Sequence, residues 1–300
     1  MRAQASSSRI ATRSRVTPPR RLVAFPYLTD VLHALGLNLA LPVPTFGLLV
    51  GVAFFTAKWL AGVEARRLMP ALAPDFMSNV CLIGFIAGLL GARVFHLLEY
   101  PRDFLAHPLA MLFSRSGFTI FGGLIVGTLA GGYYVRRKRV PLAPILDAVA
   151  PALMLGYAIG RIGCQISGDG DWGIAVASAP PGWLPHWLWA QTYDGNIAGV
   201  TLPPTGVYPT PIYESAMSFV AFGLLWKLRR HAHAPGWLFG LYLLLAGIER
   251  FAIELIRVNT TYSIFGMDVT QAQIIATTCV LAGAAIMWRR TQPGAAIAAT

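Results

Sequence analysis

Seven apolar stretches recur along the chain, and each is long enough to cross a membrane as one helix. They lie near residues 44–62, 77–98, 118–135, 142–163, 211–228, 236–256 and 270–288. About 20 helical residues cross a hydrocarbon core roughly 30 Å thick. Because backbone polar groups find no water there, each stretch should fold as a helix. The pattern predicts an all-α, polytopic integral membrane protein with seven transmembrane helices.

Positively charged residues fall in short clusters between these stretches. The net charge of +11 would suit a nucleic-acid-binding protein, but 55% of the 300 residues are hydrophobic and only 12% are charged. Clusters of this kind are typical of the cytoplasmic loops of a membrane protein. They are Arg66 and Arg67, the run Arg136–Arg139, the set Lys227, Arg229 and Arg230, and the pair Arg289 and Arg290. We therefore expect these loops and the C-terminus in the cytoplasm, and no nucleic acid as a partner.

The longest loop, residues 164–210, is expected to face outward because it contains no Lys or Arg. It carries Trp172, Trp183, Trp187 and Trp189 among prolines and glycines. Indole rings favour the headgroup level of a bilayer. This Trp-rich loop is therefore predicted to rest on the membrane surface, as an anchor or as an arm that guides a substrate.

The two chain ends differ in composition from the membrane domain, residues 42–290. Residues 1–21 are rich in Arg and Ser and contain no acidic residue, which predicts a disordered basic tail. Residues 22–41 are interrupted by Pro26, Asp30 and His33, so they should lie at the membrane interface. Either this segment returns the basic tail to the cytoplasm, or the natural chain begins further along. Residues 291–300 form a C-terminal tail.

Two arginines lie inside or beside apolar stretches, Arg161 in the fourth and Arg250 in the sixth. An arginine in a bilayer costs roughly 3 kcal/mol on insertion scales, so each requires an anionic partner. Two guanidinium groups from different helices could clamp a phosphate or a carboxylate. In the alternative interpretation, Glu254 neutralises Arg250 and Arg257 as a purely structural triad, since the spacings of four and three place them on one stripe.

Three more polar residues, Arg93, His96 and Glu99, share one helical face at the end of the second stretch. They predict either an interfacial ion pair or part of a site. Gly122 and Gly123 leave the backbone open to a neighbouring helix or to a ligand.

The glycine-rich segment after the fourth stretch contains Asp169 and Asp171. Two carboxylates at alternate positions, with no later Glu at the spacing of a calcium loop, are weak evidence for a metal, and we expect none. A turn in which Asp side chains cap backbone N–H groups is the favoured interpretation. Cys164 could act as a nucleophile beside Arg161, although a small residue that fills a helix end is the simpler interpretation.

Several segments together resemble the bacterial phosphatidylglycerol:prolipoprotein diacylglyceryl transferase family, in the same order over roughly residues 42–290. Any one of these segments is unspecific, whereas the segment that begins at Gly160, followed by the one that begins at Tyr208, is fairly specific. The segments are TFGLLVGVAF from Thr45, GARVFHLLEY from Gly91, FGGLIVG from Phe121, GRIGCQISGDGDWG from Gly160, YPTPIYE from Tyr208, GIERFAIELIR from Gly247 and TQAQIIA from Thr270.

The resemblance implies an enzyme of the bacterial inner membrane. It would move the diacylglyceryl group of phosphatidylglycerol to the thiol of a prolipoprotein lipobox cysteine and release glycerol 1-phosphate, without a cofactor. The implied catalytic residues are Arg250, His96 and Glu254. The residues implied to bind the phosphatidylglycerol phosphate are Arg161, Arg250, Gly122, Gly123, Gly163, Cys164 and Gly173.

This sequence departs from the family at three polar positions. The family has a histidine before its glycine pair, a tyrosine in the first span and an asparagine in the signature, where this chain has Phe121, Phe46 and Cys164. The base that activates the thiol could then be one of the acidic or imidazole groups His96, Glu99, Glu214, Glu249 or Glu254. Alternatively, a cationic pocket lowers the thiol pKa without a dedicated base. A non-catalytic descendant that binds an anionic lipid is the second functional hypothesis.

Overall fold

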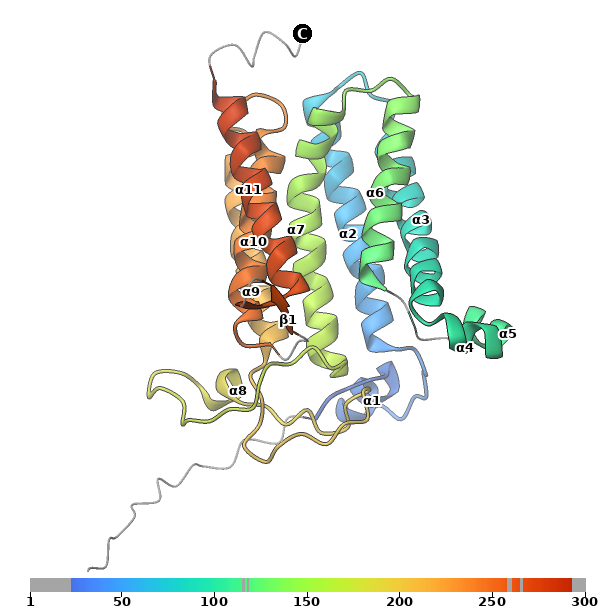
Figure 1. Cartoon of the computed structure of the whole chain (residues 1–300), viewed down its shortest axis with the longest axis vertical. Coiled ribbons are helices and arrows are strands. Elements are labelled where there is room, and N and C mark those ends of the chain that lie inside the picture. Colours follow the sequence, from blue (N-terminus) through green and yellow to red (C-terminus); the bar gives the residue numbers. More distant parts are fainter. Residues whose placement is uncertain (1–22, 115–116, 118, 258–260, 265–266, 293–300) are drawn as a thin grey trace, which may run out of the picture.

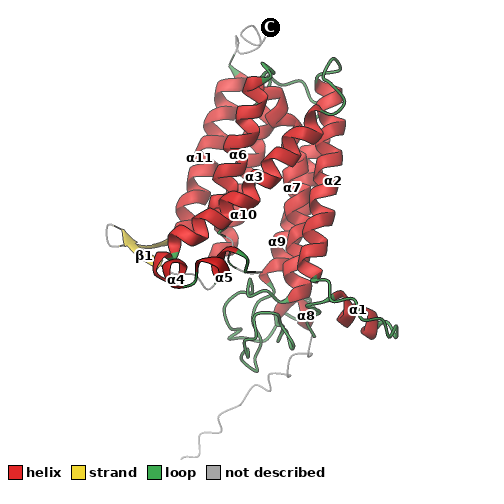
Figure 2. Ribbon diagram, turned by 90° about the vertical axis from the view of Figure 1, so that its right-hand side faces the viewer, coloured by secondary structure: helices red, strands yellow, loops and turns green. Residues whose placement is uncertain are grey.

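Seven long helices form the body of the protein, in the computed structural model that describes residues 23–114, 117, 119–257, 261–264 and 267–292. Each overlaps one of the predicted stretches. They are α2 (Thr45–Leu68), α3 (Phe76–Glu99), α6 (Ile120–Arg137), α7 (Leu142–Ser167), α9 (Thr210–Leu228), α10 (Trp237–Glu254) and α11 (Gln271–Thr291). Figures 1 and 2 show them running side by side. The basic tail of residues 1–21 lies outside the described residues.

Four of these helices, α2, α3, α7 and α11, are long and apolar enough to cross a membrane by length and composition. This supports a mostly helical membrane protein. The described parts of α6, α9 and α10 do not meet the same standard, and α10 contains Glu249, Arg250 and Glu254 within its 18 residues. That all seven cross the membrane stays a prediction.

The predicted basic clusters gather at one end of the bundle. Arg66 and Arg67 lie in the last turn of α2, and Arg289 and Arg290 in the last turn of α11. Figure 1 shows these ends beside the α6–α7 and α9–α10 connections, at the top of the view. Cations at a helix C-terminus also interact favourably with its partial negative charge. The structure therefore places these clusters at one end of the bundle, and that this end faces the cytoplasm stays a prediction.

The opposite end carries the short elements and the long loop (Figures 1 and 2). The elements are α1 (Leu28–Ala34), α4 (Pro101–Ala106), α5 (Pro108–Leu112), α8 (His186–Trp189), and the antiparallel strands β1 (Thr261–Ile264) and β2 (Met267–Thr270). The hairpin of β1 and β2 is an addition to the all-α prediction. The backbone N–H of Phe25 donates to the Ile166 carbonyl at 2.7 Å, and the Thr45 hydroxyl donates to the Phe25 carbonyl at 2.5 Å. The N-terminal segment is thereby attached to the ends of α7 and α2.

Buried acids hold the helices together at the basic end. Glu64 on α2 forms ion pairs with Arg67 at 2.8 Å and Arg229 at 3.0 Å. Asp147 on α7 accepts hydrogen bonds from the N–H groups of Gly236 at 2.6 Å and Phe239 at 2.9 Å. Asp147 thus caps the N-terminus of a different helix, α10, where a negative charge is favourable.

Glycines allow close packing of α3 against α6. A Cβ added to Gly122 would lie 2.5 Å from the Gly91 carbonyl oxygen, and one added to Gly123 would lie 3.2 Å from the Gly88 oxygen. The sequence predicts either a neighbouring helix or a ligand beside Gly122 and Gly123. In the structure, helix α3 lies there. Such small-residue contacts let helix backbones approach closely in membranes.

The α10–α11 interface is packed as tightly, and this gives a test. A Cβ at Gly247 would lie 2.6 Å from the Ala276 carbonyl oxygen, whereas a Cβ at Gly223 on α9 meets nothing within 4 Å. Gly247→Ala should lower the thermal unfolding midpoint of the detergent-purified protein, because overpacking costs about 1–3 kcal/mol. Gly223→Ala is the matched control and should leave it unchanged or raise it. Equal midpoints for the two variants would contradict this packing.

Candidate functional site

The C-terminal end of α7 turns back through the glycine-rich signature. Gly168 ends the helix in the left-handed conformation, with φ of 63°. The loop that follows is attached to two other helices. The Thr210 hydroxyl donates to the Asp171 carbonyl at 2.5 Å, and the Ile174 N–H donates to the Ile256 carbonyl at 2.8 Å. The loop therefore places Asp171 where α7, α9 and α10 meet.

Gly173 lies where this loop passes closest to the end of α10. A Cβ there would lie 2.6 Å from the Ile256 carbonyl oxygen and 3.0 Å from Tyr208 Cβ. Gly173 also forms an isolated antiparallel bridge with Arg257. A side chain would force the two segments apart, so the glycine sets the position of Arg257 relative to the loop.

Three arginine side chains converge on the carboxylate of Glu214, near the start of α9. Arg161 from α7 forms an ion pair with Glu214 Oε2. Arg250 Nη1 on α10 lies 3.4 Å from Oε1, and Arg257 Nη1 lies 3.6 Å from the same oxygen. The Glu214 side chain is only 1% exposed. We call the following set the arginine network: Arg161, Arg250, Arg257, Glu214, Asp171 and Glu254.

Two further carboxylates complete the charge balance of the network. Asp171 pairs with Arg161 and with Arg257, each at 2.6 Å, and Glu254 pairs with Arg250 at 2.7 Å. Burial alone would raise the pKa of the Asp171 carboxyl, but the two guanidinium groups outweigh it and hold that pKa below its usual range. Three cations thus face three carboxylates, as buried charges require.

Three of the predicted site residues lie together in the network: Arg161, Arg250 and Glu254. Sequence reasoning did not find that Glu214 stands at its centre or that Asp171 bridges two arginines. A signal was available for Glu214. It is an acid inside an otherwise apolar stretch, and such a charge needs a partner as much as Arg161 does.

Two further polar contacts, of which the second is buried, continue from the network along α7 and α9. The Tyr157 hydroxyl on α7 donates to Glu214 Oε1 at 3.3 Å. One turn further along α9, the Ser218 hydroxyl donates to Glu249 Oε1 on α10 at 2.6 Å. Hydroxyl and carboxyl groups therefore line the interior between α7, α9 and α10.

His96 lies on α3, away from these contacts. Its ring packs against the backbone of Gly117, whose carbonyl accepts a hydrogen bond from Arg93 at 2.7 Å. The Glu99 carboxylate accepts a hydrogen bond from the Thr119 hydroxyl at 3.0 Å. Among the described residues, no hydrogen bond or ion pair joins His96 to the arginine network. These three predicted residues contact Gly117 and Thr119, and a catalytic role for His96 stays a prediction.

Cys164 lies in the last turns of α7, with its Sγ 3.4 Å from Arg161 Nη1. Its Sγ and one oxygen each of Asp169 and Asp171 lie within 4.8 Å of one another, so this donor set could hold a metal ion. Both Asp171 oxygens already bind guanidinium groups, however. Asp169 Oδ1 accepts a hydrogen bond from the Asp171 N–H at 3.3 Å, which agrees with the predicted turn.

Apolar residues occupy the two other positions where the family resemblance implies polar groups. Phe46, in the first turn of α2, packs against Gly163 on α7, where an added Cβ would lie 3.4 Å from the Phe46 ring. Phe121 is half-buried in the first turn of α6. Gly163 therefore allows α2 to approach α7 next to Cys164.

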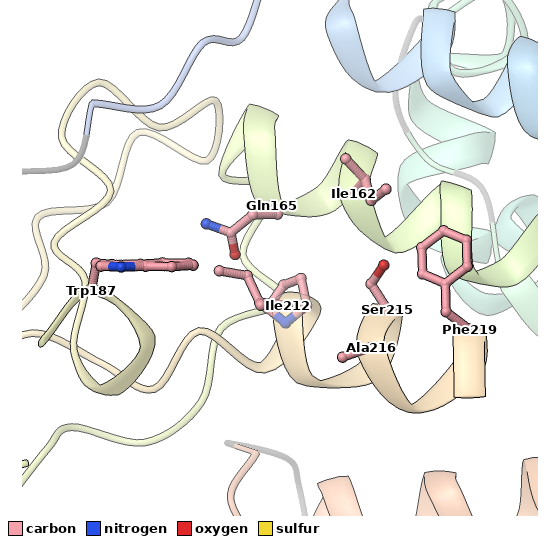
Figure 3. A pocket seen from close by; sticks show the side chains of 8 residues that line it. Ile162, Gln165, Trp187, Ile212, Ser215, Ala216 and Phe219 are labelled. Atoms are coloured by element: carbon pink, nitrogen blue, oxygen red, sulfur yellow. The ribbon is translucent and has the colours of Figure 1, made fainter. Parts of the chain in front are cut away.

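An apolar groove of about 370 Å³ opens on the neighbouring face of α7 and α9 (Figure 3). Gln165 and Trp187 stand at one end of it and Phe219 at the other. The Tyr193 hydroxyl donates to Gln165 Oε1 at 2.7 Å, and Gln165 Nε2 donates to Gln191 Oε1 at 2.6 Å. The long loop, through Trp187, thus forms one wall of a groove adjacent to the arginine network.

Comparison with known proteins gives one consistent result. The sequence model of the family described as prolipoprotein diacylglyceryl transferase matches residues 34–289. A phosphatidylglycerol–prolipoprotein diacylglyceryl transferase of Chromohalobacter salexigens is 31% identical over 278 residues, which cover 91% of this chain and 96% of the relative. Relatives with the same name occur in Xanthomonas campestris, at 33% identity over 71% of this chain and 75% of the relative, and in Leptospira interrogans, at 32% over 72% and 71%. The matched residues run from before α2 into α11 and include every residue of the arginine network, and the chain therefore belongs to the prolipoprotein diacylglyceryl transferase family.

Proposed function

We propose that the protein transfers the diacylglyceryl group of phosphatidylglycerol to a cysteine thiol of a prolipoprotein and releases glycerol 1-phosphate. Family membership supports this reaction, because the relatives described above are named for it. The structural observation that carries the proposal is the convergence of Arg161, Arg250 and Arg257 on one buried carboxylate. None of these relatives gives support to the hypothesis of a non-catalytic lipid-binding descendant.

The arginine network suits the phosphate of the lipid. When the bond between the diacylglyceryl carbon and the phosphate oxygen breaks, negative charge develops on the leaving phosphate. Guanidinium groups held in place before the reaction stabilise such charge most strongly in a site without water. The Arg250 side chain is 29% exposed, against 11% for Arg161, so Arg250 is the more accessible of the two.

The apolar groove suits the hydrocarbon part of a lipid. Ile162 and Ser215, which line it, directly follow Arg161 and Glu214 in sequence. A molecule with a phosphate at the network and acyl chains along α7 and α9 would therefore contact adjacent faces of the same two helices. We place Gly163, Cys164 and Gly173 at the edge of this site, and the lipobox cysteine of the prolipoprotein as the acceptor.

We place the protein in the bacterial inner membrane, with seven spans and its basic end and C-terminus in the cytoplasm. The four apolar helices and the bacterial relatives support a multi-pass membrane protein. The gathering of basic clusters at one end supports the orientation. The arginine network lies toward the opposite end, where it would face secreted precursors.

The reaction itself is tested by incubating the purified protein with radiolabelled phosphatidylglycerol and a lipobox peptide. We expect equal amounts of released glycerol phosphate and lipidated peptide. The protein should also restore precursor lipidation in cells depleted of their own transferase. Correct membrane insertion without either result would overturn the proposed function.

Replacing Arg161 or Arg250 with Gln should reduce glycerol phosphate release by at least about 10²-fold, because loss of one preorganised donor costs this much in comparable sites. Arg102→Gln removes an exposed arginine at the same end of the bundle and is the matched control. Unfolding midpoints should be measured in parallel. A folded Arg161→Gln variant with full activity would exclude the role in phosphate binding.

The orientation is tested with alkaline phosphatase fusions, since this enzyme is active only outside the cytoplasm. Fusion within residues 177–183 should be active, whereas fusion after Arg139 or at the C-terminus should be inactive. The reverse pattern would place the arginine network on the cytoplasmic side and contradict the proposed orientation.

A further inference from the structure

Glu249 is a buried carboxyl group that has no direct ion pair within the arginine network. It lies on α10, directly before Arg250, and only 6% of its surface is exposed. Its Oε1 accepts the hydrogen bond from Ser218, whereas Oε2 is buried and has no hydrogen-bond partner among the described residues. An unsatisfied buried polar atom costs about 1–3 kcal/mol, so a native protein that keeps one requires an explanation.

The surroundings place this carboxyl next to the site. Ser218 lies one turn from Glu214 on α9, about 6 Å along the helix axis. Arg161 Nε is also buried without a hydrogen-bond partner among the residues described. The titratable groups that act on Glu249 are Glu214 from α9, Arg161 and Tyr157 from α7, and Tyr242 from its own helix. A free donor and a free acceptor thus occupy the interior between α7, α9 and α10.

The proposed transfer releases one proton that the site must accept. The thiol sulfur forms a bond to the diacylglyceryl carbon, while the bond from that carbon to the phosphate oxygen breaks and its electron pair stays on the phosphate. The S–H proton must leave first or in the same step, because the thiolate is the nucleophile. The carboxylates of Glu214, Asp171 and Glu254 already form ion pairs with guanidinium groups, whereas Glu249 forms none within the network.

We propose that Glu249 is the base that accepts the proton of the acceptor thiol. The proton passes to Oε2, the free oxygen, while the Ser218 hydroxyl holds Oε1 and so fixes the carboxyl group. The thiolate then attacks the lipid whose phosphate is held by Arg161 and Arg250. The proton afterwards passes to the released phosphate or to water, which restores the carboxylate. This inference rests on the proposed transferase function.

The test compares initial rates of peptide lipidation between pH 5 and 9. Glu249→Gln keeps the shape and the hydrogen bond with Ser218, yet cannot accept a proton. We expect a rate at least about 10²-fold lower than in the wild type, the usual contribution of a general base. The wild-type rate should increase with pH as the Glu249 carboxyl ionises and should then reach a plateau. The rate of the Glu249→Gln variant should instead keep increasing with pH up to the ionisation of the thiol.

Three further variants test whether the rate depends on the position of the Glu249 carboxyl group. Glu249→Asp should recover part of the rate and the plateau, and Ser218→Ala should retain the plateau at a reduced rate. Asp103→Asn changes an exposed acid on α4 and is the matched control. Binding of radiolabelled phosphatidylglycerol should be unchanged in Glu249→Gln. If Glu249→Gln does not fold, the rate and the pH profile of Glu249→Asp test the proposal instead. A rate and a pH profile equal to those of the wild type would contradict it, because the shorter side chain moves the carboxyl group.

Two failures are distinguishable. A wild-type protein that releases no glycerol phosphate would overturn the transferase function itself. An active wild type with a Glu249→Gln variant of equal rate and equal pH profile would overturn only the role of Glu249.

Discussion

Burial of the Glu214 carboxylate among three guanidinium groups is the interaction on which this structure depends. Removing a single ion from water costs several kcal/mol in a protein interior, and the cost is met only when every charge has a partner at close range. Glu214, Asp171 and Glu254 supply those partners to arginines on α7, on α10 and beyond its end. The network therefore joins α7, α9 and α10 at one end of the bundle, and its arginines are the groups that we propose to hold the lipid phosphate.

Helix positions could be predicted from sequence, because they depend on local properties. Apolar runs of sufficient length, bounded by basic clusters, located all seven long helices to within a few residues at most ends. The first run was predicted to end at residue 62, whereas α2 continues to Leu68. Its extra turns contain Glu64 and Arg67, whose charges are paired in the folded protein and so do not end the helix.

The partners of the polar side chains could not be predicted, because tertiary contacts select them. The sequence predicts a turn at Asp171, yet its carboxylate also binds Arg257, which lies 86 positions later. Gly122 could have faced a lipid or a helix, and only the position of α3 decides between them. Side-chain chemistry groups Arg161 with Arg250, and an acid inside an apolar stretch marks Glu214, whereas only the position of α9 beside α7 and α10 shows that Glu214 joins the two arginines.

The signature loop has a mechanical consequence. Its backbone forms hydrogen bonds with Thr210 at the start of α9 and with Ile256 just after α10. The Asp171 carboxylate also pairs with Arg161 from α7 and with Arg257 beyond α10. Helices α3 and α6, by contrast, pack chiefly against each other and make few contacts with α2 and α7. Separating α7 from α10 requires breaking buried ion pairs, whereas the α3–α6 pair is joined to α2 and α7 by an apolar core that contains Phe76, Val135 and Ile145. The protein is thus divided into one half that buried ion pairs hold together and another that apolar contacts join to it, and a shift of the second half relative to the first would leave every ion pair of the arginine network in place.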